Sequence, residues 1–208
     1  TFDLFPFRLQ LTINRAALIK LFTGKTIVVD PAHGGNDAGG RGQVSLWEKD
    51  AVMPIARNLE KLLKRTGANV VLTRLGDEDI SQEARCQLAK RESADVYISL
   101  HTFSSTDSKV SGAATKYNVN SKDSLALATC VQEELLRKIK VKDRGVVEEL
   151  EYILPADIPA VKVEVVTITN IVEEVFLRGL TIQKRAAEGI FNGLRDYFAV
   201  NQSDFKGA

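Results

Sequence analysis

The sequence has little net charge, no long apolar run and only two cysteines. Lys and Arg total 28 against 27 acidic residues, which gives a formal net charge of +1 and no obvious stripe for binding a polyanion. Nucleic acid is therefore not an expected partner. The longest apolar runs, Thr26–Val29 and Val163–Ile168, are far shorter than the roughly 20 residues that cross a bilayer, so no membrane span is expected.

The two cysteines carry little information. Cys86 and Cys130 could pair in an oxidising compartment, but both lie in helix-like stretches, where a buried apolar role is commoner. The chain starts at Thr1 rather than Met, so an upstream export signal or anchor could have been removed. The sequence alone therefore leaves the compartment open.

The composition predicts one compact domain. Of the 208 residues, 44% are hydrophobic and 26% are charged, and neither internal repeats nor low-complexity tracts occur. We expect this domain at residues 25–200, with a C-terminal tail at 201–208 and an N-terminal extension at 1–24. Within the extension, apolar residues predict an extended stretch at 2–11, followed by a short helix from Asn14 to Phe22. The extension could add a strand to the sheet edge, link to another domain or bind a partner.

Short β-branched runs alternate with stretches of helical period from residue 25 onward. This alternation predicts a single-domain α/β fold with a twisted, mostly parallel sheet of about six strands flanked by helices. The expected strands are Thr26–Asp30, Asn69–Thr73, Val96–Leu100, Ala113–Val119, Tyr152–Leu154 and Ala160–Thr167. The expected major helices are one carrying an apolar stripe from Val52 to Leu63, then Ser81–Arg91, Ser124–Lys140 and Ile182–Phe198.

Only two histidines are present, and each follows an apolar run that is predicted to be a strand. His33 comes after Ile27–Asp30, and His101 comes after Val96–Leu100. The carboxyl ends of parallel strands form the crevice in which ligands bind, so the two imidazoles can converge there. A single histidine in such a place is more often an ordinary capping or partly buried residue. Two together favour a zinc site, because imidazole is the commonest zinc ligand.

A catalytic zinc site of this type also needs a carboxylate ligand. Glu48 is the candidate, because it opens the first predicted helix after the glycine-rich loop Gly34–Gly42 and so lies near the end of the strand that precedes His33. The amides and dipole of a helix N-terminus favour the ionised form that a metal ligand needs. Taken alone, a glutamate that merely stabilises its helix is the commoner explanation.

Glu164 is the least ordinary carboxylate, because it lies inside a run that otherwise has the pattern of a strand. Charged groups in buried strands are rare unless they are paired, metal-bound or catalytic. Alternation with Lys162 allows an equally weighted explanation, in which both side chains face solvent. The residues by themselves do not choose between the two.

Two other enzyme classes find little support. The glycines after the first strand have neither the Gly-x-Gly-x-x-Gly order nor the Gly-Lys-Ser/Thr ending of a phosphate-binding loop. Ser99 is not within a Gly-x-Ser-x-Gly elbow, which argues against a serine hydrolase.

Several short motifs, taken in order, resemble the zinc-dependent N-acetylmuramoyl-L-alanine amidases of the Amidase_3 family. They are Asp30–Gly35, Glu48–Asp50, Thr73–Arg74, Ser99–His101 and Pro159–Glu164. The resemblance runs from about Lys25 to Phe198. It implies that His33, Glu48 and His101 bind one Zn²⁺ ion and that Glu164 is catalytic.

This resemblance also implies a substrate and a place of action. The expected substrate is peptidoglycan, cleaved at the amide bond between the lactyl group of N-acetylmuramic acid and L-alanine. The expected location is extracytoplasmic, in the bacterial cell envelope. A protein regulator or a separate wall-binding domain remains open as a partner. Residues 117–125 form only a short connection where some members insert a helix that blocks the site, which implies that this form of self-inhibition is missing here.

The chain departs from the family pattern close to the predicted site. Phe103 stands where Asn is usual, Val166-Thr167 where Gly-Phe is usual, and Ala32 where Gly is usual. All four chemical groups remain, but the departures predict an altered substrate groove and altered turnover. They also motivate a competing hypothesis, a peptidoglycan-binding or partner-regulated protein with weak or no catalysis. A zinc hydrolase acting on another amide is a further alternative, because fold and metal do not fix the substrate.

Overall fold

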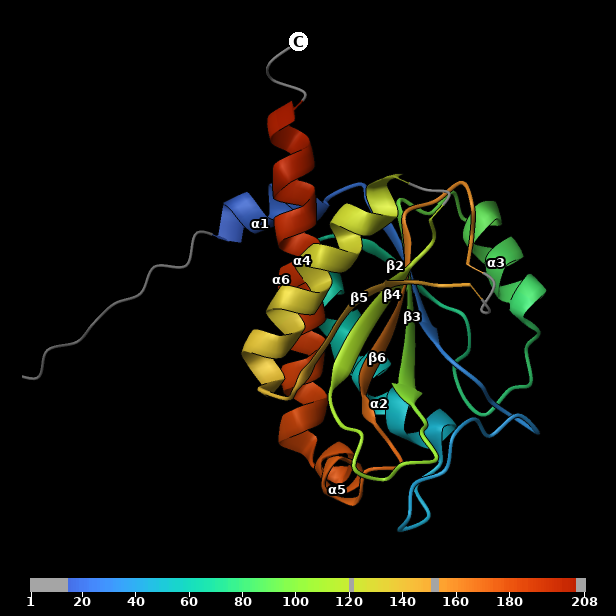
Figure 1. The fold of residues 1–208 in the computed structure, drawn as a ribbon. Coiled ribbons are helices and arrows are strands. Elements are labelled where there is room, and N and C mark those ends of the chain that lie inside the picture. Colours follow the sequence, from blue (N-terminus) through green and yellow to red (C-terminus); the bar gives the residue numbers. More distant parts are fainter. Residues whose placement is uncertain (1–14, 120–121, 151–153, 205–208) are drawn as a thin grey trace, which may run out of the picture.

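One six-stranded sheet forms the centre of the computed structural model, which describes residues 15–119, 122–150 and 154–204 (Figure 1). The strands are β1 (Thr26–Pro31), β2 (Asn69–Leu72), β3 (Val96–Phe103), β4 (Ala113–Tyr117), β5 (Asp143–Glu148) and β6 (Ala160–Thr167). Their order is β2-β1-β3-β6-β4-β5. Neighbours pair in parallel except β4 and β6, which are antiparallel. The predicted α/β fold with a mostly parallel sheet is confirmed.

Helices cover both faces of the sheet. They are α1 (Arg15–Phe22), α2 (Glu48–Lys64), α3 (Gln82–Arg91), α4 (Lys122–Ile139), α5 (Ile171–Arg178) and α6 (Leu180–Asp204). Helices α2 and α4 pack on one face and α6 packs against both of them, whereas α3 lies on the opposite face (Figure 1). Since Cys86 lies on α3 and Cys130 on α4, the sheet separates them; both are free thiols and cannot pair within one molecule.

The apolar stripe predicted for the first major helix forms much of the core. On α2 the side chains of Val52, Ile55, Leu59 and Leu63 recur at three- and four-residue spacing, and all are fully buried. Each such side chain contributes about 1.5–3 kcal/mol on burial. A smaller cluster lies under α3 on the other face of the sheet. Helix α2 thereby fixes the position of its first residue, Glu48, relative to the strands.

Two strand predictions need correction. Of the strand expected at Tyr152–Leu154, residues 152–153 lie outside the described residues and Leu154 is not in a strand. The remaining strand is β5, an edge strand that is half exposed and therefore has no apolar run to reveal it. Strand β3 continues to Phe103, so His101 lies within the strand rather than after it.

The short helix predicted before residue 24 is confirmed as α1. Its last residue, Phe22, is fully buried in the main core, with its ring stacked on Phe191 at 5.4 Å and edge-on to Phe198 at 5.5 Å between centroids. The extended stretch predicted at 2–11 lies outside the described residues. At the other end, α6 continues to Asp204, into the segment predicted as a tail.

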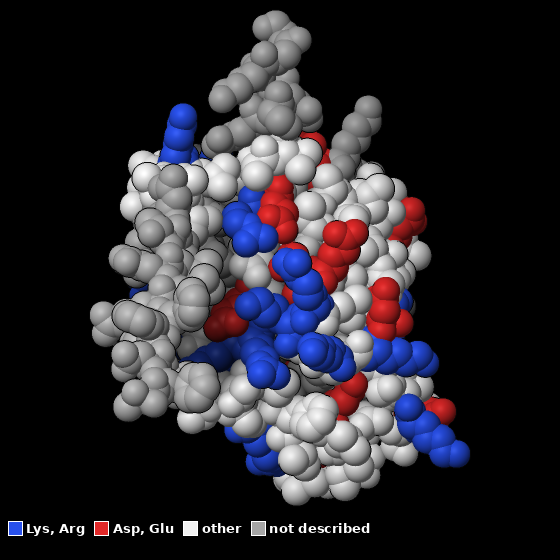
Figure 2. All heavy atoms as spheres, turned by 90° about the vertical axis from the view of Figure 1, so that its left-hand side faces the viewer, with Lys and Arg blue, Asp and Glu red and all other residues white. Residues whose placement is uncertain are grey.

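Charges of both signs occur on the face that carries α4 and α6. Figure 2 shows Lys and Arg side chains gathered near the middle of this face, with Asp and Glu side chains among them. Ion pairs such as Lys138–Glu188, at 3.1 Å, join α4 to α6. Among the described helices, none combines the length and apolar character that a bilayer crossing requires.

Candidate metal centre

His33 lies in the loop after β1, in a backbone conformation that few residues adopt. Its φ is 61°, and non-glycine residues with such values are uncommon outside strained or functional positions. Two arginines hold this segment: Arg85 donates to the carbonyl of His33 at 2.7 Å and Arg74 to that of Ala32 at 3.1 Å. Gly39 is required for space, because a Cβ there would lie 2.5 Å from Cδ2 of His33.

Glu48, the first residue of α2, is only 4% exposed. The backbone amides of Gly40 and Thr102 each donate to its carboxylate at 2.8 Å. Its two oxygens also face the two imidazoles, with Oε2 3.3 Å from Nε2 of His33 and Oε1 3.1 Å from Nδ1 of His101. The loop and the strand therefore aim this carboxylate between the histidines.

His101 completes a group that can hold a metal ion. The rings of His33 and His101 meet edge to face with centroids 5.2 Å apart, and His101 is 4% exposed. One ligand atom each from His33, Glu48 and His101 lies within 4.8 Å of the others. In residues 15–119, 122–150 and 154–204, no other three His, Cys, Asp or Glu side chains form such a group.

The protonation states of Glu48 and His101 suit ligation. Burial alone would raise the pKa of Glu48, but hydrogen bonds and charge from His101 and His33 hold that pKa far below its ordinary value. Burial is the largest influence on the pKa of His101, and although Glu48 acts to raise that pKa, the net pKa is lowered. For His33 burial also acts to lower the pKa, but Glu48 and Asp37 outweigh it and the net pKa is raised. Glu48 is thus ionised and His101 favours the neutral form that binds metals.

Asp37 was not identified from the sequence. Its Oδ2 lies 2.8 Å from Nδ1 of His33, an arrangement that leaves Nε2 facing Glu48 and fixes the ring orientation. A single aspartate in a glycine-rich loop gives no pattern by which to find it. Two imidazoles and one carboxylate form a donor set typical of catalytic zinc sites, so the residues present fit that ion.

Glu164 lies on β6 beside the metal-ligand group. It pairs in register with His101 on the parallel strand β3, so both side chains project from the same face of the sheet. Glu164 is 3% exposed, which rules out the solvent-facing explanation for this residue. Its Oε2 accepts a hydrogen bond from Nη1 of Arg144 at 2.9 Å, and its Oε1 lies 3.3 Å from Nζ of Lys116. Neither cation was predicted from the sequence to be a site residue, although Arg144 lies in a segment that shares the family resemblance.

A β-bulge follows this pair of residues. Between the pairs His101–Glu164 and Phe103–Thr167, β6 contains one residue more than β3. Bulges often occur next to active sites, where they redirect side chains. Val166, which departs from the family pattern, lies in this bulge, and Thr167 is the residue that pairs again with Phe103.

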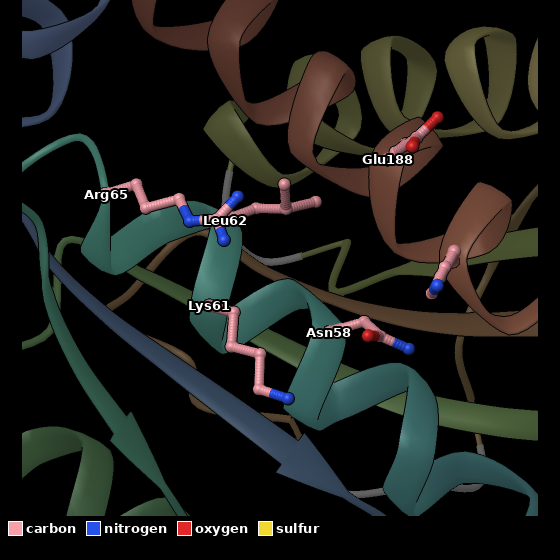
Figure 3. A pocket seen from close by; sticks show the side chains of 6 residues that line it. Asn58, Lys61, Leu62, Arg65 and Glu188 are labelled. Carbon is pink, nitrogen blue, oxygen red and sulfur yellow. The ribbon is translucent and has the colours of Figure 1, made fainter.

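One surface hollow adjoins the site, and a second lies apart from it. One of about 220 Å³ opens at His33 and His101, and its other lining residues are Asp37, Asp79, Ile80, Ser81, Gln82 and Arg85. The second, of about 350 Å³, lies between α2 and α6 (Figure 3). Asn58 on its wall is ten residues after Glu48 on the same helix, which corresponds to about 15 Å along the axis. The second hollow shares no residue with the metal-ligand group.

Comparison with known proteins places the chain in a family. Residues 27–196 match the family model Amidase_3, described as N-acetylmuramoyl-L-alanine amidase. The N-acetylmuramoyl-L-alanine amidase LytC of Bacillus subtilis is 32% identical over 84% of this chain and 36% of LytC. The chain thus spans about a third of that relative's length.

Solved structures agree with this match. The structure of an N-acetylmuramoyl-L-alanine amidase from Clostridium difficile 630 has 35% sequence identity and a TM-score of 0.81, over 84% of this chain and 97% of that one. The CwlD amidase from Clostridioides difficile, solved in complex with the GerS lipoprotein, has 29% identity and a TM-score of 0.78, over 85% and 99%. The chain belongs to the N-acetylmuramoyl-L-alanine amidase family, Amidase_3.

Proposed function

We propose that this protein hydrolyses the amide bond between the lactyl group of N-acetylmuramic acid and L-alanine in peptidoglycan, with zinc as cofactor. One observation carries the proposal: His33, Glu48 and His101 converge to within 4.8 Å, with Glu164 paired to His101 on the next strand. Membership in the amidase family supports the choice of substrate.

His33, Glu48 and His101 would hold the zinc ion. Bound there, zinc supplies a Lewis acid that lowers the pKa of water and polarises the scissile carbonyl. Contacts within the protein orient these ligands: Asp37 orients His33, and the amides of Gly40 and Thr102 orient Glu48. Such outer contacts support metal affinity.

Glu164 would serve as the general base. Its carboxylate accepts a proton from the attacking water and returns it to the amine of L-alanine as the amide bond breaks. Water is the nucleophile, so no covalent intermediate with the protein forms. This role requires that one carboxylate oxygen of Glu164 remain able to take a proton.

The proposal extends to location and partners. Peptidoglycan lies outside the cytoplasmic membrane, so we place this activity in the bacterial cell envelope. The structural neighbour CwlD was solved in complex with a lipoprotein. We therefore propose that this chain also binds a protein regulator.

The substitution Glu164→Gln tests the assigned base. Removing a positioned base typically lowers the rate by about 10²–10⁴-fold. The measurement is release of stem peptides from purified peptidoglycan, with zinc content determined on the same samples. Near-native release by Glu164→Gln would rule out the assignment. Full activity in protein shown to contain no metal would rule out the zinc dependence.

The same assay separates the competing hypotheses. A binding protein without catalysis, suggested by Phe103 and Val166-Thr167, would retain peptidoglycan but release nothing even with excess zinc. Mass spectrometry of the products would identify the cleaved bond and distinguish a muramoyl amidase from a hydrolase of another amide.

A further inference from the structure

Both carboxylate oxygens of Glu164 contact cations. Arg144 on β5 donates from Nη1 to Oε2 at 2.9 Å, and Nζ of Lys116 on β4 lies 3.3 Å from Oε1. Because Glu164 is 3% exposed, its charge is tolerated only with such partners. The two cations also decide which way the carboxylate points.

These two cations are held differently. The lysine is a flexible point charge, and its Nζ also lies 3.9 Å from Oε2 of Glu149. The guanidinium of Arg144 lies over the ring of Phe103, with Cζ 3.6 Å from the ring centroid. A planar guanidinium on an aromatic face is held by cation–π attraction as well as by its hydrogen bond. Arg144 is therefore the more rigid of the two contacts.

Phe103 reaches this position because of the sheet order. It lies two residues after His101 on β3, whereas Arg144 comes from the edge strand β5, with β6 and β4 in between. The arginine crosses toward the ring and contacts Glu164 on the way. Phe103, which stands where the family pattern has Asn, thus packs against Arg144, the arginine that is bound to Glu164.

The two oxygens of Glu164 consequently differ. Among the described residues, Arg144 is the hydrogen-bond donor to this side chain, through Oε2. Within the described part of the chain, the contact of Oε1 is the longer one with Lys116, so Oε1 is the oxygen better able to accept a proton. Because the hydrogen bond from Arg144 holds Oε2, the carboxylate of Glu164 cannot rotate freely, and the orientation of Oε1 is fixed as well.

We infer that Arg144 is a positioning residue for Glu164 and that Phe103 fixes Arg144 in that position. This inference rests on the proposed function, since it assigns to Arg144 the orientation of the general base. A positioning role acts on the chemical step, because a misplacement of about 1 Å can cost about 100-fold in rate. It leaves substrate binding and metal ligation unchanged.

Steady-state kinetics on a soluble N-acetylmuramoyl-L-alanyl peptide test the inference in the zinc-loaded full chain. We expect Arg144→Gln to lower kcat by about 100-fold, with KM changed less than about threefold and with unchanged zinc affinity by chelator competition. Arg144→Lys, which keeps the charge without the planar group, should recover part of kcat. Arg137→Gln, at an ion-paired arginine on α4, is the matched control and should behave as wild type.

Phe103 variants provide the second arm. Phe103→Leu should lower kcat by about tenfold and Phe103→Tyr should preserve it, because only an aromatic ring supports the guanidinium. The double variant Phe103→Leu/Arg144→Gln should be no slower than Arg144→Gln alone, because Phe103 acts through Arg144. If Arg144→Gln does not fold, Arg144→Lys and Phe103→Leu carry the test.

Other outcomes show whether the inference about Arg144 fails alone or whether the proposed function fails as well. A rise in KM with unchanged kcat, or additive effects of the two substitutions, would overturn the inference and assign Arg144 to substrate binding or to general stability. If wild type is active, Glu164→Gln is inactive and Arg144→Gln keeps full kcat, the inference fails and the proposed function stands. If wild type is inactive, or Glu164→Gln is fully active, the proposed function itself fails.

Discussion

Asp30 shows how one buried residue supports the candidate metal centre. This carboxylate at the end of β1 is fully buried. Its hydrogen-bond donors are Thr73 and Arg85 at 2.5 Å and Tyr97 and Ser99 at 2.7 Å. Burial alone would raise the pKa of Asp30, but the charge of Arg85 and these hydrogen bonds hold it below its ordinary value. Because Arg85 also binds the carbonyl of His33, Asp30 helps to position a proposed ligand.

The substitution Asp30→Asn should therefore destabilise the protein by about 3–5 kcal/mol, because it leaves Arg85 buried without its counter-ion. The measurement is urea unfolding at neutral pH. Asp157→Asn, at the exposed pair with Lys90, is the control and should cost less than about 1 kcal/mol. An equal cost for the two substitutions would contradict the role assigned to Asp30.

The lowered pKa of Asp30 predicts that the free energy of unfolding depends on pH. Since the pKa of Asp30 in the folded state lies below the ordinary value of 3.8, its ionised form stabilises the fold above that pH. This contribution is lost as the pH falls through the lowered pKa. On acidification in that range, the free energy of unfolding should therefore fall more steeply for wild type than for Asp30→Asn.

Helix α5 holds the loop that leads to Glu48. The carboxylate of Glu174 accepts hydrogen bonds from the amides of Val44 at 2.6 Å and Leu46 at 2.9 Å, and it packs against Gly42. These contacts join the segment after β6 to the segment before α2. A helix that contributes no metal ligand therefore influences the position of one.

We expect Glu174→Gln to weaken zinc binding by about tenfold, because contacts beyond the ligands typically affect metal affinity by about 10–100-fold. Competition with a chelator measures the change in zinc affinity. Glu188→Gln, at an ion pair between α4 and α6, serves as the control. Equal zinc affinity in Glu174→Gln and wild type would show that the loop holds Glu48 without α5.

Close packing of α4 on α6 depends on glycine. A Cβ at Gly193 would lie 2.5 Å from Cα of Val131, and one at Gly189 would lie 2.7 Å from Cα of Leu135. Glycine inside a helix normally costs about 1 kcal/mol relative to alanine. Here the close approach of the two backbones outweighs that penalty.

Gly193→Ala should therefore destabilise the protein by about 1–3 kcal/mol, although alanine is the better helix former. Thermal or urea unfolding measures the change. Lys184→Ala, on the exposed side of the same helix, should stay within about 0.5 kcal/mol of wild type. A stabilised Gly193→Ala would mean that the two helices can move apart at little cost.

At the scale of the whole molecule, the proposed ligands come from distant parts of one domain. His33 follows β1, Glu48 begins α2 and His101 lies in β3, so a bound metal ion would link the loop, the helix and the sheet. Binding to the folded state alone stabilises a protein by mass action.

Zinc at about 100 times its dissociation constant should therefore raise the free energy of unfolding by about 2.7 kcal/mol, and a chelator should reverse the gain. The increase in Tm on zinc addition measures it. The double variant His33→Ala/His101→Ala should show no zinc-dependent increase. The same increase in that variant would place zinc binding elsewhere on the chain.

The sequence by itself determined the type of fold and named the four proposed site residues. The alternation of strand and helix patterns predicted the α/β sheet, and the placement of His33 and His101 relative to that pattern predicted that they would meet. Glu48 was a candidate from its place at the start of a helix, and the family resemblance assigned Glu48 and Glu164 their roles. For the two histidines, residue type and local spacing were sufficient, because the carboxyl ends of parallel strands lie at one edge of a sheet.

Only the tertiary structure decided what surrounds these residues. The contact of Arg144 with Phe103 and Glu164 depends on the order β3-β6-β4-β5, which brings together strands that are not consecutive in the sequence. Strand β5 was missed because an exposed edge strand needs no apolar pattern. Asp37 was missed because its contact with His33 depends on the unusual backbone conformation of His33, which the sequence does not reveal. Such contacts depend on the order of the strands in the sheet and on side-chain packing, which local sequence patterns do not encode.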